Sequence, residues 1–321
     1  MPARLAAAFL ALLVLMSPPA RAATFEDPDE VYAALAAPAD AVLTIGGGNI
    51  AVSFAEGAPG LDRDLALAWI RDAATAVTTY FGRFPVARVG ILVVAGDGAG
   101  VSGGTTWGHA GSAIRVVVGP GTDAAGFRRD WVMVHEMTHL ALPRLAERHL
   151  WIQEGSAVYV EPLARAQAGF LDQAGAWRDS FHGMPKGEPG PDDRGLDLTH
   201  TWGRTYWGGA TFCLLADIAI RQETGNAKGL QDAFRAINRA SGGNGAFWTM
   251  ERLIETGDAA TGTHVLARLY GEMADRPVAT DLPALFTALG IAEQGGHLTF
   301  DDEAPLARLR ASLIMPERPA L

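Results

Sequence analysis

The sequence predicts an α+β fold in which a small mixed sheet with flanking helices is followed by a mostly helical C-terminal half. Two features of the 321 residues indicate this fold. Short β-branched segments punctuated by glycine all fall before residue 119, and such segments are typical of strands. Apolar residues at helical spacing dominate from Tyr206 onward. We therefore expect an α+β lobe over residues 24–170 and a mainly helical lobe over residues 171–321.

The first lobe contains predicted strands with one long helix between them. Leu61, Leu65, Trp69, Ala73, Val77 and Tyr80 fall at helical spacing and predict an amphipathic helix that packs on the sheet. The helix that carries His135 is expected to begin after Thr122 or Asp123, since either side chain can cap it. The predicted strands are residues 42–45, 50–54, 89–95 and 114–118.

The chain changes character after Glu161. Residues 183–200 are rich in Gly, Pro and Asp and show no regular period, so we expect a long surface loop there. Long loops in compact domains are often functional, and this one is expected to line a cleft as a lid. Helical patterns then follow, and these helices would form one wall of the cleft. The predicted helices are residues 206–223, 229–240, 247–257, 263–274 and 282–289.

Residues 1–22 have the layout of a secretory signal peptide. Arg4 precedes an apolar stretch at residues 5–16, and the small residues Ala20 and Ala22 mark a cleavage site. The apolar stretch is too short to span a bilayer, and no later segment is apolar for long enough. We expect an exported chain, periplasmic or secreted, without a membrane span.

The most informative motif is an H-E-x-x-H signature formed by His135, Glu136 and His139. Residues four apart lie on one face of a helix, so both imidazoles can bind one ion at about 2.0–2.1 Å. Glu136 is turned by about 100° from His135 and can instead reach a water held at the metal. Glu136 is therefore the predicted general base and not a ligand.

Glu154 is the predicted third ligand. A catalytic zinc site has three protein ligands and one open position. The spacing from His139 lets the first helix end near Pro143 and a second helix begin near Trp151. We predict one Zn²⁺ per chain, held by His135, His139 and Glu154, although another divalent metal could occupy the same set. The alternative is an ordinary buried helix whose two histidines have other partners.

Three blocks of sequence, in this order, resemble the catalytic core of the gluzincin metallopeptidases. They are HEMTH at 135–139, WIQEGSAVYVE at 151–161 and TYWGGA at 205–210. The resemblance covers about residues 88–225. It extends to the aminopeptidase and glycyl-aminopeptidase branches and to compact peptidase MA-like domains, and it implies a thermolysin-like metallopeptidase fold.

The same resemblance assigns roles to two further residues. It implies that Tyr206 donates a hydrogen bond to the oxyanion of the tetrahedral intermediate. By analogy, Glu161 would orient a metal ligand. The residues alone leave alternatives open, because Tyr206 also fits a core tyrosine between two tryptophans and Glu161 also fits an exposed residue at a helix end.

One stretch departs from the family pattern. Aminopeptidases of this group carry a Gly-x-Met-Glu-Asn strand before the first zinc histidine, and its Glu binds the free amine of the substrate. Residues 103–107 read GGTTW and contain no carboxylate. A typical aminopeptidase is therefore not expected, and an endopeptidase or a hydrolase of unusual peptides fits better. An extended substrate can still pair with a sheet edge through main-chain groups.

These features predict an exported zinc-dependent peptidase. A metal-activated water would attack the peptide bond, Glu136 would take the proton of that water, and Tyr206 would stabilise the oxyanion. The substrate would be a peptide or a protein. Two alternatives stay open: a metallopeptidase-like binding protein with little or no activity, and an amide hydrolase that acts on cell-wall peptides. A formal net charge of −10 argues against a nucleic-acid partner.

Four other reactive side chains have ordinary interpretations. His109 is expected on the polar surface, with a position facing the cleft as the alternative. His149 is expected to be an interhelix contact, not a fourth ligand. Arg204 is expected on the surface at a helix start, with binding of a substrate carboxylate as the alternative. Cys213, the one cysteine, lies in an apolar helical run and is expected to be a buried thiol.

Overall fold

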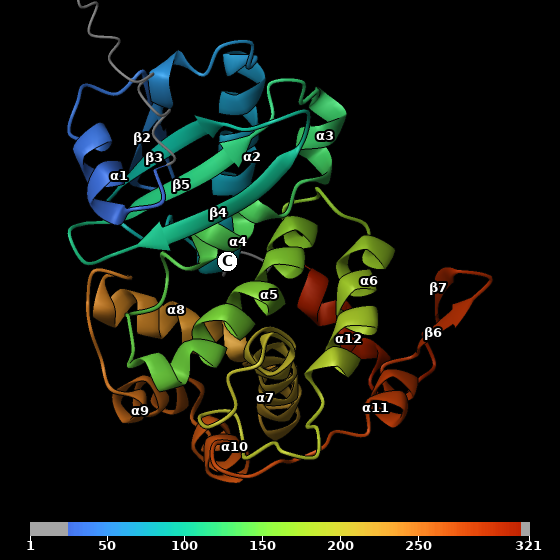
Figure 1. Cartoon of the computed structure of the whole chain (residues 1–321). Helices are drawn as coiled ribbons and strands as arrows, with labels where there is room; N and C mark the ends of the chain where they lie inside the picture. Colours follow the sequence, from blue (N-terminus) through green and yellow to red (C-terminus); the bar gives the residue numbers. More distant parts are fainter. Residues whose placement is uncertain (1–24, 316–321) are drawn as a thin grey trace, which may run out of the picture.

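The computed structural model describes residues 25–315, so the predicted signal peptide at 1–22 lies outside the described residues. The chain has the expected α+β architecture, with a five-stranded sheet and its helices at the top of Figure 1 and a mostly helical half below. One continuous cluster of buried apolar side chains runs from the sheet into the helical half. Within residues 25–315, no helix has the length and apolar character needed to cross a bilayer.

The sheet is mixed and has the strand order β1-β2-β3-β5-β4. Its centre is parallel, and the two edge strands, β1 and β4, pair antiparallel with their neighbours. The four predicted strands are confirmed as β1, β2, β3 and β5. β4 was not predicted, because Gly103 and Gly104 interrupt its apolar pattern. The strands are β1 (Ala41–Ile45), β2 (Gly48–Phe54), β3 (Arg88–Ala95), β4 (Val101–Trp107) and β5 (Ala113–Val118).

Helix α2 (Arg63–Phe81) confirms the predicted amphipathic helix. Asp62 caps its start by accepting a hydrogen bond from the Leu65 N–H, and Gly82 ends it with φ of 74°. The buried face of α2 contacts β1 and also the helices of the lower half. On the other face of the sheet, α1 (Pro28–Leu35) contacts β3 and β5.

The expected cap of the histidine helix was wrong. Asp123 caps a separate short helix, α3 (Ala124–Arg129), by accepting from the Gly126 N–H. The histidine helix α4 (Val132–Thr138) begins only afterwards, and Asp130 accepts hydrogen bonds from its first N–H groups. The predicted end near Pro143 was too late, because α4 stops at Thr138.

A short 3₁₀ turn, η2 (Glu147–His149), leads into α5 (Leu150–Gln167), which begins one residue before the predicted start. α5 is the central helix of the lower half and packs against α2, α4, α6 and α7 (Figure 1). It therefore joins the sheet and its helices to the rest of the chain.

The helical half confirms the five predicted helices with shifts of their ends, and it adds α6, a hairpin and α12. A π-helical turn, η4 (Arg204–Gly208), precedes α7. The remaining elements are α6 (Gln173–Gly183), α7 (Gly209–Glu223), α8 (Leu230–Ser241), α9 (Met250–Thr261), α10 (Val265–Met273), α11 (Leu282–Ala288), β6 (Ile291–Gln294), β7 (His297–Phe300) and α12 (Ala307–Ile314).

The prediction of a surface loop over residues 183–200 was wrong in part. Its first residues complete α6 and form a 3₁₀ turn, η3 (Met184–Gly187). Further along, Leu196 and Asp197 are buried, and their N–H groups donate to the carbonyls of Met273 and Ala274 at 2.9 and 2.8 Å. These contacts tie the segment to the end of α10, because its buried backbone groups need partners.

Candidate metal centre

The first two predicted ligands lie in the middle and at the end of α4. All residues of this short helix are buried, so it is held in place from several sides. Asp130 fixes its start by accepting from the N–H groups of Val132 and Met133, both at 3.1 Å, and from the Trp69 indole N–H at 2.9 Å. His135 follows in the middle of α4, and His139 is its C-cap.

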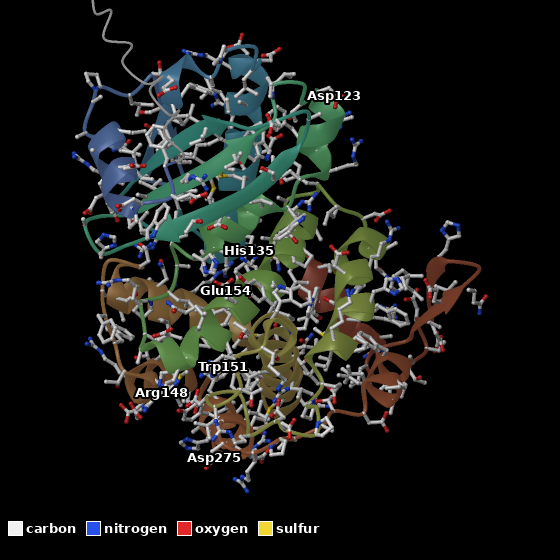
Figure 2. The ribbon with its side chains drawn as sticks, in the orientation of Figure 1. Asp123, His135, Arg148, Trp151, Glu154 and Asp275 are labelled. Carbon is white, nitrogen blue, oxygen red and sulfur yellow. The ribbon has the colours of Figure 1, made fainter. Side chains whose placement is uncertain are left out.

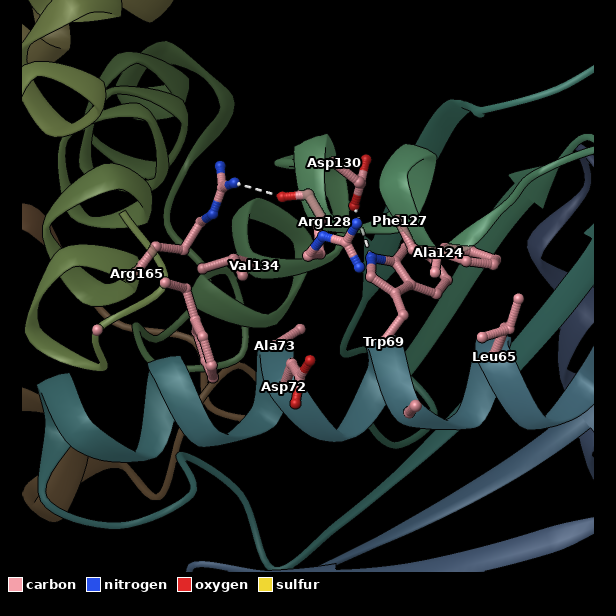
Figure 3. Close-up of a pocket in the computed structure, with 13 residues that line it drawn as sticks. Leu65, Trp69, Asp72, Ala73, Ala124, Phe127, Arg128, Asp130, Val134 and Arg165 are labelled. Carbon is pink, nitrogen blue, oxygen red and sulfur yellow. Dashed lines mark hydrogen bonds between the residues drawn. The ribbon is translucent and has the colours of Figure 1, made fainter. Parts of the chain in front are cut away.

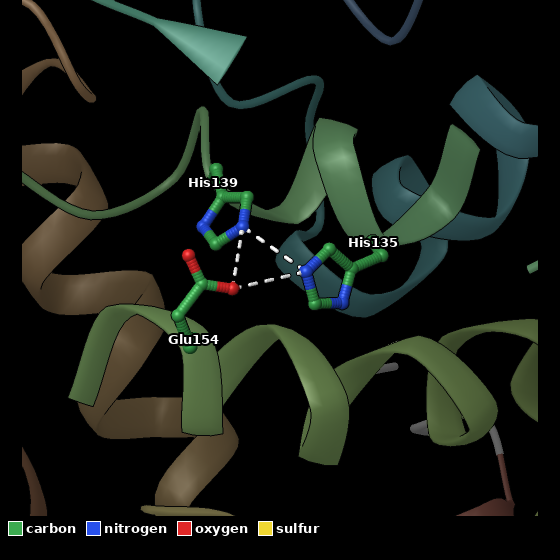
Figure 4. Close-up of side chains that lie close together, drawn as sticks. All are labelled: His135, His139 and Glu154. Carbon is green, nitrogen blue, oxygen red and sulfur yellow. Dashed lines mark hydrogen bonds and ion pairs between the residues drawn. The ribbon is translucent and has the colours of Figure 1, made fainter. Parts of the chain in front are cut away.

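The structure brings His135, His139 and Glu154 together. Nε2 of His135 lies 3.2 Å from Nε2 of His139 and 3.3 Å from Oε2 of Glu154, and the remaining distance, from His139 Nε2 to Glu154 Oε2, is 3.4 Å (Figure 4). Glu154 comes from α5, and its carboxylate faces the two imidazoles (Figure 4), while Figure 2 places both His135 and Glu154 below the sheet. Three donor atoms thus converge on one point.

The geometry and chemistry of this cluster fit a zinc ion. Ligand atoms about 2.0–2.1 Å from a tetrahedral ion are separated from one another by about 3.4 Å. The three measured separations, 3.2 to 3.4 Å, match that spacing. Two imidazoles and a carboxylate with an open fourth position form a ligand set typical of catalytic zinc. The residues present therefore fit the metal that the sequence predicts.

The local electrostatics also favour a cation. Burial alone would raise the pKa of Glu154, but the imidazoles of His139 and His135 lower it well below its ordinary value. Burial alone would lower the pKa of His139, but the carboxylates of Glu154 and Glu136 outweigh that effect and raise it. A carboxylate that stays ionised beside two imidazole nitrogens is an arrangement that a divalent cation stabilises.

Glu136 lies next to this cluster and is held by the edge strand β4. Oγ1 of Thr106 donates to Oε2 of Glu136 at 2.7 Å and also contacts the Glu136 carbonyl oxygen at 3.0 Å. Gly104 lies two residues earlier on the same face of β4. A Cβ at Gly104 would lie 2.5 Å from Cγ of Glu136, so only glycine allows this close approach. Thr106 and Gly104 together hold the Glu136 carboxylate against β4.

Tyr206 stands in the π-helical turn η4 and borders the same cavity as the three ligand candidates. Its ring stacks on that of His135, with 6.4 Å between centroids and 10° between planes. Burial and the nearby carboxylate of Glu154 raise the pKa of Tyr206 to about 12, so the hydroxyl keeps its proton at neutral pH. Close packing of Gly155 on Gly209 brings this turn up to α5, since a Cβ on Gly155 would lie 2.3 Å from the Gly209 backbone.

The three metal-ligand candidates line a cavity of about 420 Å³. Edge strand β4 forms one side of it, and the start of α5 forms another. Residues 183–200 contribute nothing to its described lining, so the predicted lid does not cover this cavity, although Gly183 and Lys186 line the neighbouring cavity that shares His135 and Tyr206 with it. The cavity is lined by Gly104, Thr105, Thr106, Trp107, Gly108, His109, His135, Glu136, His139, Arg144, Leu145, Leu150, Gln153, Glu154, Tyr206, Asn244 and Phe247.

Another cavity, of about 470 Å³, is lined by residues of α2, α3, α4 and α5, among them Trp69, Phe127 and Arg165 (Figure 3). Trp69 and Asp130 meet there in the hydrogen bond described above, and Arg165 donates to the carbonyl of Arg128 at 3.1 Å. None of the metal-ligand candidates is among its described lining residues. Its polar contacts support the start of α4.

Two of the predicted interpretations were wrong. Arg204 is 4% exposed and not on the surface; it pairs with buried Asp193 at 2.7 Å and donates to the Gly187 carbonyl. That burial also removes it as a ligand for a substrate carboxylate. Glu161 is buried and not exposed, and it pairs with Arg165 at 2.7 Å instead of with a ligand histidine.

The other three residues were assigned more accurately. His149 is buried and bonds through Nδ1 to Asp197 at 2.8 Å, and its ring lies 6.1 Å from that of Tyr270 in α10, which confirms the expected interhelix contact. Cys213 is a buried free thiol, as predicted. His109 is exposed, as expected, and it also lines the metal-site cavity, as the alternative had it.

Sequence reasoning missed Thr106, Gly104, Arg144 and Phe247 as parts of the site. The alternation of Gly104 and Thr106 on one strand face is a signal for the first two, once β4 is known to border α4. Arg144 and Phe247 come from segments about a hundred residues apart that meet in a β-bridge, with the Arg144 guanidinium 5.9 Å from the Phe247 ring centroid. Nothing local in the sequence marks that meeting.

Comparison with known proteins gives matches of structure alone. No family model and no curated protein matches the sequence. An aminopeptidase N family protein from Idiomarina loihiensis matches with a TM-score of 0.58 and 14% identity, over 79% of this chain and 49% of that protein. An M1 zinc metallopeptidase from Deinococcus radiodurans matches with a TM-score of 0.46 and 18% identity, over 76% and 52%.

The chain thus spans about half the length of these solved structures. The identity is low, so the match describes architecture and not activity. The resemblance that the HEMTH, WIQEGSAVYVE and TYWGGA blocks suggested extends to the backbone, and the chain has the fold seen in the aminopeptidase N family protein.

Proposed function

We propose that this chain is an exported zinc-dependent peptidase. One observation carries the proposal: Nε2 of His135, Nε2 of His139 and Oε2 of Glu154 converge at 3.2 to 3.4 Å, and the carboxylate of Glu136 borders the same cavity. Three ligands and an adjacent base are what hydrolysis at a metal requires. Export rests on the signal-peptide pattern of residues 1–22.

The residues of the chain divide the chemistry among them. His135, His139 and Glu154 would hold the zinc ion, which supplies Lewis acidity toward a carbonyl and a water. Glu136 takes the proton of the attacking water and returns it to the leaving amine. Its Oε2 is held by Thr106, so Oε1 is the oxygen left for that proton. The Tyr206 hydroxyl donates to the oxyanion, in keeping with its raised pKa.

The cavity favours a substrate without a free amine at the reacting end. Among its described lining residues, the only carboxylates are Glu136 and Glu154, both of which have roles in the reaction. Arg144 is the one arginine among these lining residues, and its guanidinium would repel an ammonium group. We therefore infer an endopeptidase, or a hydrolase of unusual peptides, and not a typical aminopeptidase. The exposed edge of β4 offers main-chain groups for an extended substrate.

Two alternatives remain as outcomes of experiment. A metallopeptidase-like binding protein has no need of a base, whereas Thr106 and Gly104 hold Glu136 in a defined position. This arrangement favours the enzyme. An amide hydrolase of cell-wall peptides would use the same residues. The rates of cleavage of muropeptides and of an unfolded protein are therefore compared, and cleavage of muropeptides alone would identify the amide hydrolase.

The direct test of the proposal is Glu136→Gln. The amide cannot accept a proton, so the rate of peptide cleavage should fall by at least about 10²-fold while the metal content stays unchanged. His135→Ala should lose both metal and cleavage. Cleavage of a fluorogenic peptide library and metal content are measured on the same samples. A fully active Glu136→Gln protein would refute the assignment of the base.

A further inference from the structure

A further cavity, distinct from the one lined by Trp69 and Asp130, adjoins the metal-site cavity on the side of Tyr206. Its volume is about 280 Å³. It shares His135 and Tyr206 with the metal-site cavity, so the two cavities meet at these side chains. We call it the aromatic pocket. It is lined by Trp131, His135, Val158, Glu161, Pro162, Asp179, His182, Gly183, Lys186, Trp202, Tyr206 and Trp207.

Two tryptophans flank this pocket and are unusually exposed. Trp202 is 60% exposed and Trp131 is 49% exposed. Trp202 stacks on Tyr206 with 5.9 Å between centroids, and Trp131 meets His135 edge-on at 5.4 Å. The four rings therefore form a continuous aromatic surface that reaches from solvent to the metal centre. A contiguous patch of large exposed apolar side chains usually marks a binding site.

The charged groups of the pocket do not select a charged ligand. Glu161 pairs with Arg165 at 2.7 Å, and His182 faces Glu293 at 3.4 Å. Asp179 and Lys186 are exposed and opposite in sign. What remains as a selective feature is the apolar wall of Trp131, Val158, Pro162, Trp202 and Trp207.

We infer that the aromatic pocket receives the side chain of the substrate residue next to the scissile bond, and that it selects large apolar, above all aromatic, side chains. The inference rests on the proposed function, because it takes the scissile bond to lie at the metal centre. Burial of a Phe side chain stabilises a complex by about 1.5–3 kcal/mol, and ring pairing adds to this. The preference for Phe over Ala at this position should therefore be roughly 10- to 100-fold in kcat/KM.

The test compares matched peptides that carry Phe, Ala or Lys at each residue flanking the cleaved bond. The wild type should prefer Phe on one side of the bond. Trp202→Ala should reduce the Phe-to-Ala ratio at least about threefold, and Val158→Phe, which fills the pocket, should favour Ala. Phe170→Ala is the matched control, because Phe170 is 43% exposed and lies outside the pocket. A preference for Lys, or an unchanged ratio in both pocket variants, would overturn the inference.

A binding experiment separates failure of the pocket from failure of the proposed function. N-acetylphenylalaninamide and N-acetylalaninamide are titrated into the Glu136→Gln protein, and ligand-detected NMR reports binding. The Phe compound should bind more tightly, and Trp202→Ala in the same background should remove the difference. If the wild type cleaves no peptide but this difference is present, the peptidase proposal fails and the pocket stands. Equal binding of both compounds would refute the pocket.

Discussion

Thr106 donates a hydrogen bond of 2.7 Å to Oε2 of Glu136, from the edge strand of the sheet to the helix that carries two metal-ligand candidates. The same hydroxyl contacts the Glu136 carbonyl at 3.0 Å, so it fixes both the side chain and the backbone of this residue. A carboxylate with one oxygen held can present the other in a single direction. Thr106 is thus a positioning residue for the base.

Thr106→Val removes this hydrogen bond and keeps the shape of the side chain. A hydrogen bond to a charged group contributes about 1.5–3 kcal/mol, so kcat should fall by at least roughly tenfold. KM should change little, because Thr106 acts through Glu136. Thr106→Ser should restore most of kcat. Thr105→Val on the same strand is the control, since the Thr105 hydroxyl donates to the neighbouring Gly104 carbonyl and its side chain lies on the opposite face of the strand from Thr106. Equal kcat in the Val and Ser variants would refute the positioning role.

Gly104→Ala should displace the base without removing the metal. The added Cβ would lie 2.5 Å from Cγ of Glu136, and a shift of about 1 Å in a catalytic group costs roughly 10²-fold in rate. Gly103→Ala is the matched comparison, because nothing lies within 4 Å of its added Cβ. The measurement is kcat/KM together with metal content. Equal activity of the two variants would contradict the described contact between β4 and α4.

Glu161 makes the stability of the protein depend on pH. Burial raises its pKa to about 7, although Arg165 opposes the shift. The folded protein therefore holds a proton that the unfolded chain releases above about pH 4.5. The free energy of unfolding should accordingly fall as the pH rises from about 4.5 to 7.

Glu161→Gln removes this dependence and keeps an acceptor for Arg165. The difference in free energy of unfolding between wild type and variant should change by on the order of 2 kcal/mol between pH 5 and pH 8, in favour of the variant at the higher pH. Urea unfolding of chelator-treated samples measures it. Parallel stability curves for the two proteins would show that Glu161 stays ionised throughout.

The convergence of His135, His139 and Glu154 was predictable because its geometry is local. His135 and His139 are four residues apart at the end of one helix, and Glu154 lies on the helix that follows. Their spacing in the sequence was therefore enough to predict that the three side chains share one site. The strands that the sequence predicted have continuous β-branched patterns. The predicted long helix was found because its apolar residues repeat at helical spacing over five turns.

Contacts between distant segments could not be predicted in the same way. Arg204 looked like a surface residue because charged residues are mostly exposed, and its burial depends on two partners distant in sequence, Asp193 and the Gly187 carbonyl. Asp197 lies in a Gly- and Pro-rich stretch, yet it accepts hydrogen bonds from Trp151 and Tyr270. Those partners are far away in sequence. The role of Thr106 likewise depends on which helix the edge strand borders.

The most direct test of the central claim is the zinc content of the purified protein, by elemental analysis, beside Glu154→Ala and Glu154→Gln. The wild type should contain one zinc per chain and lose peptide cleavage on treatment with a chelator, with recovery when zinc is restored. Both variants should bind zinc more weakly, because one of three ligands is removed. Zinc that is absent from the wild type, or bound equally well by the variants, would contradict the assignment of His135, His139 and Glu154 as a metal site.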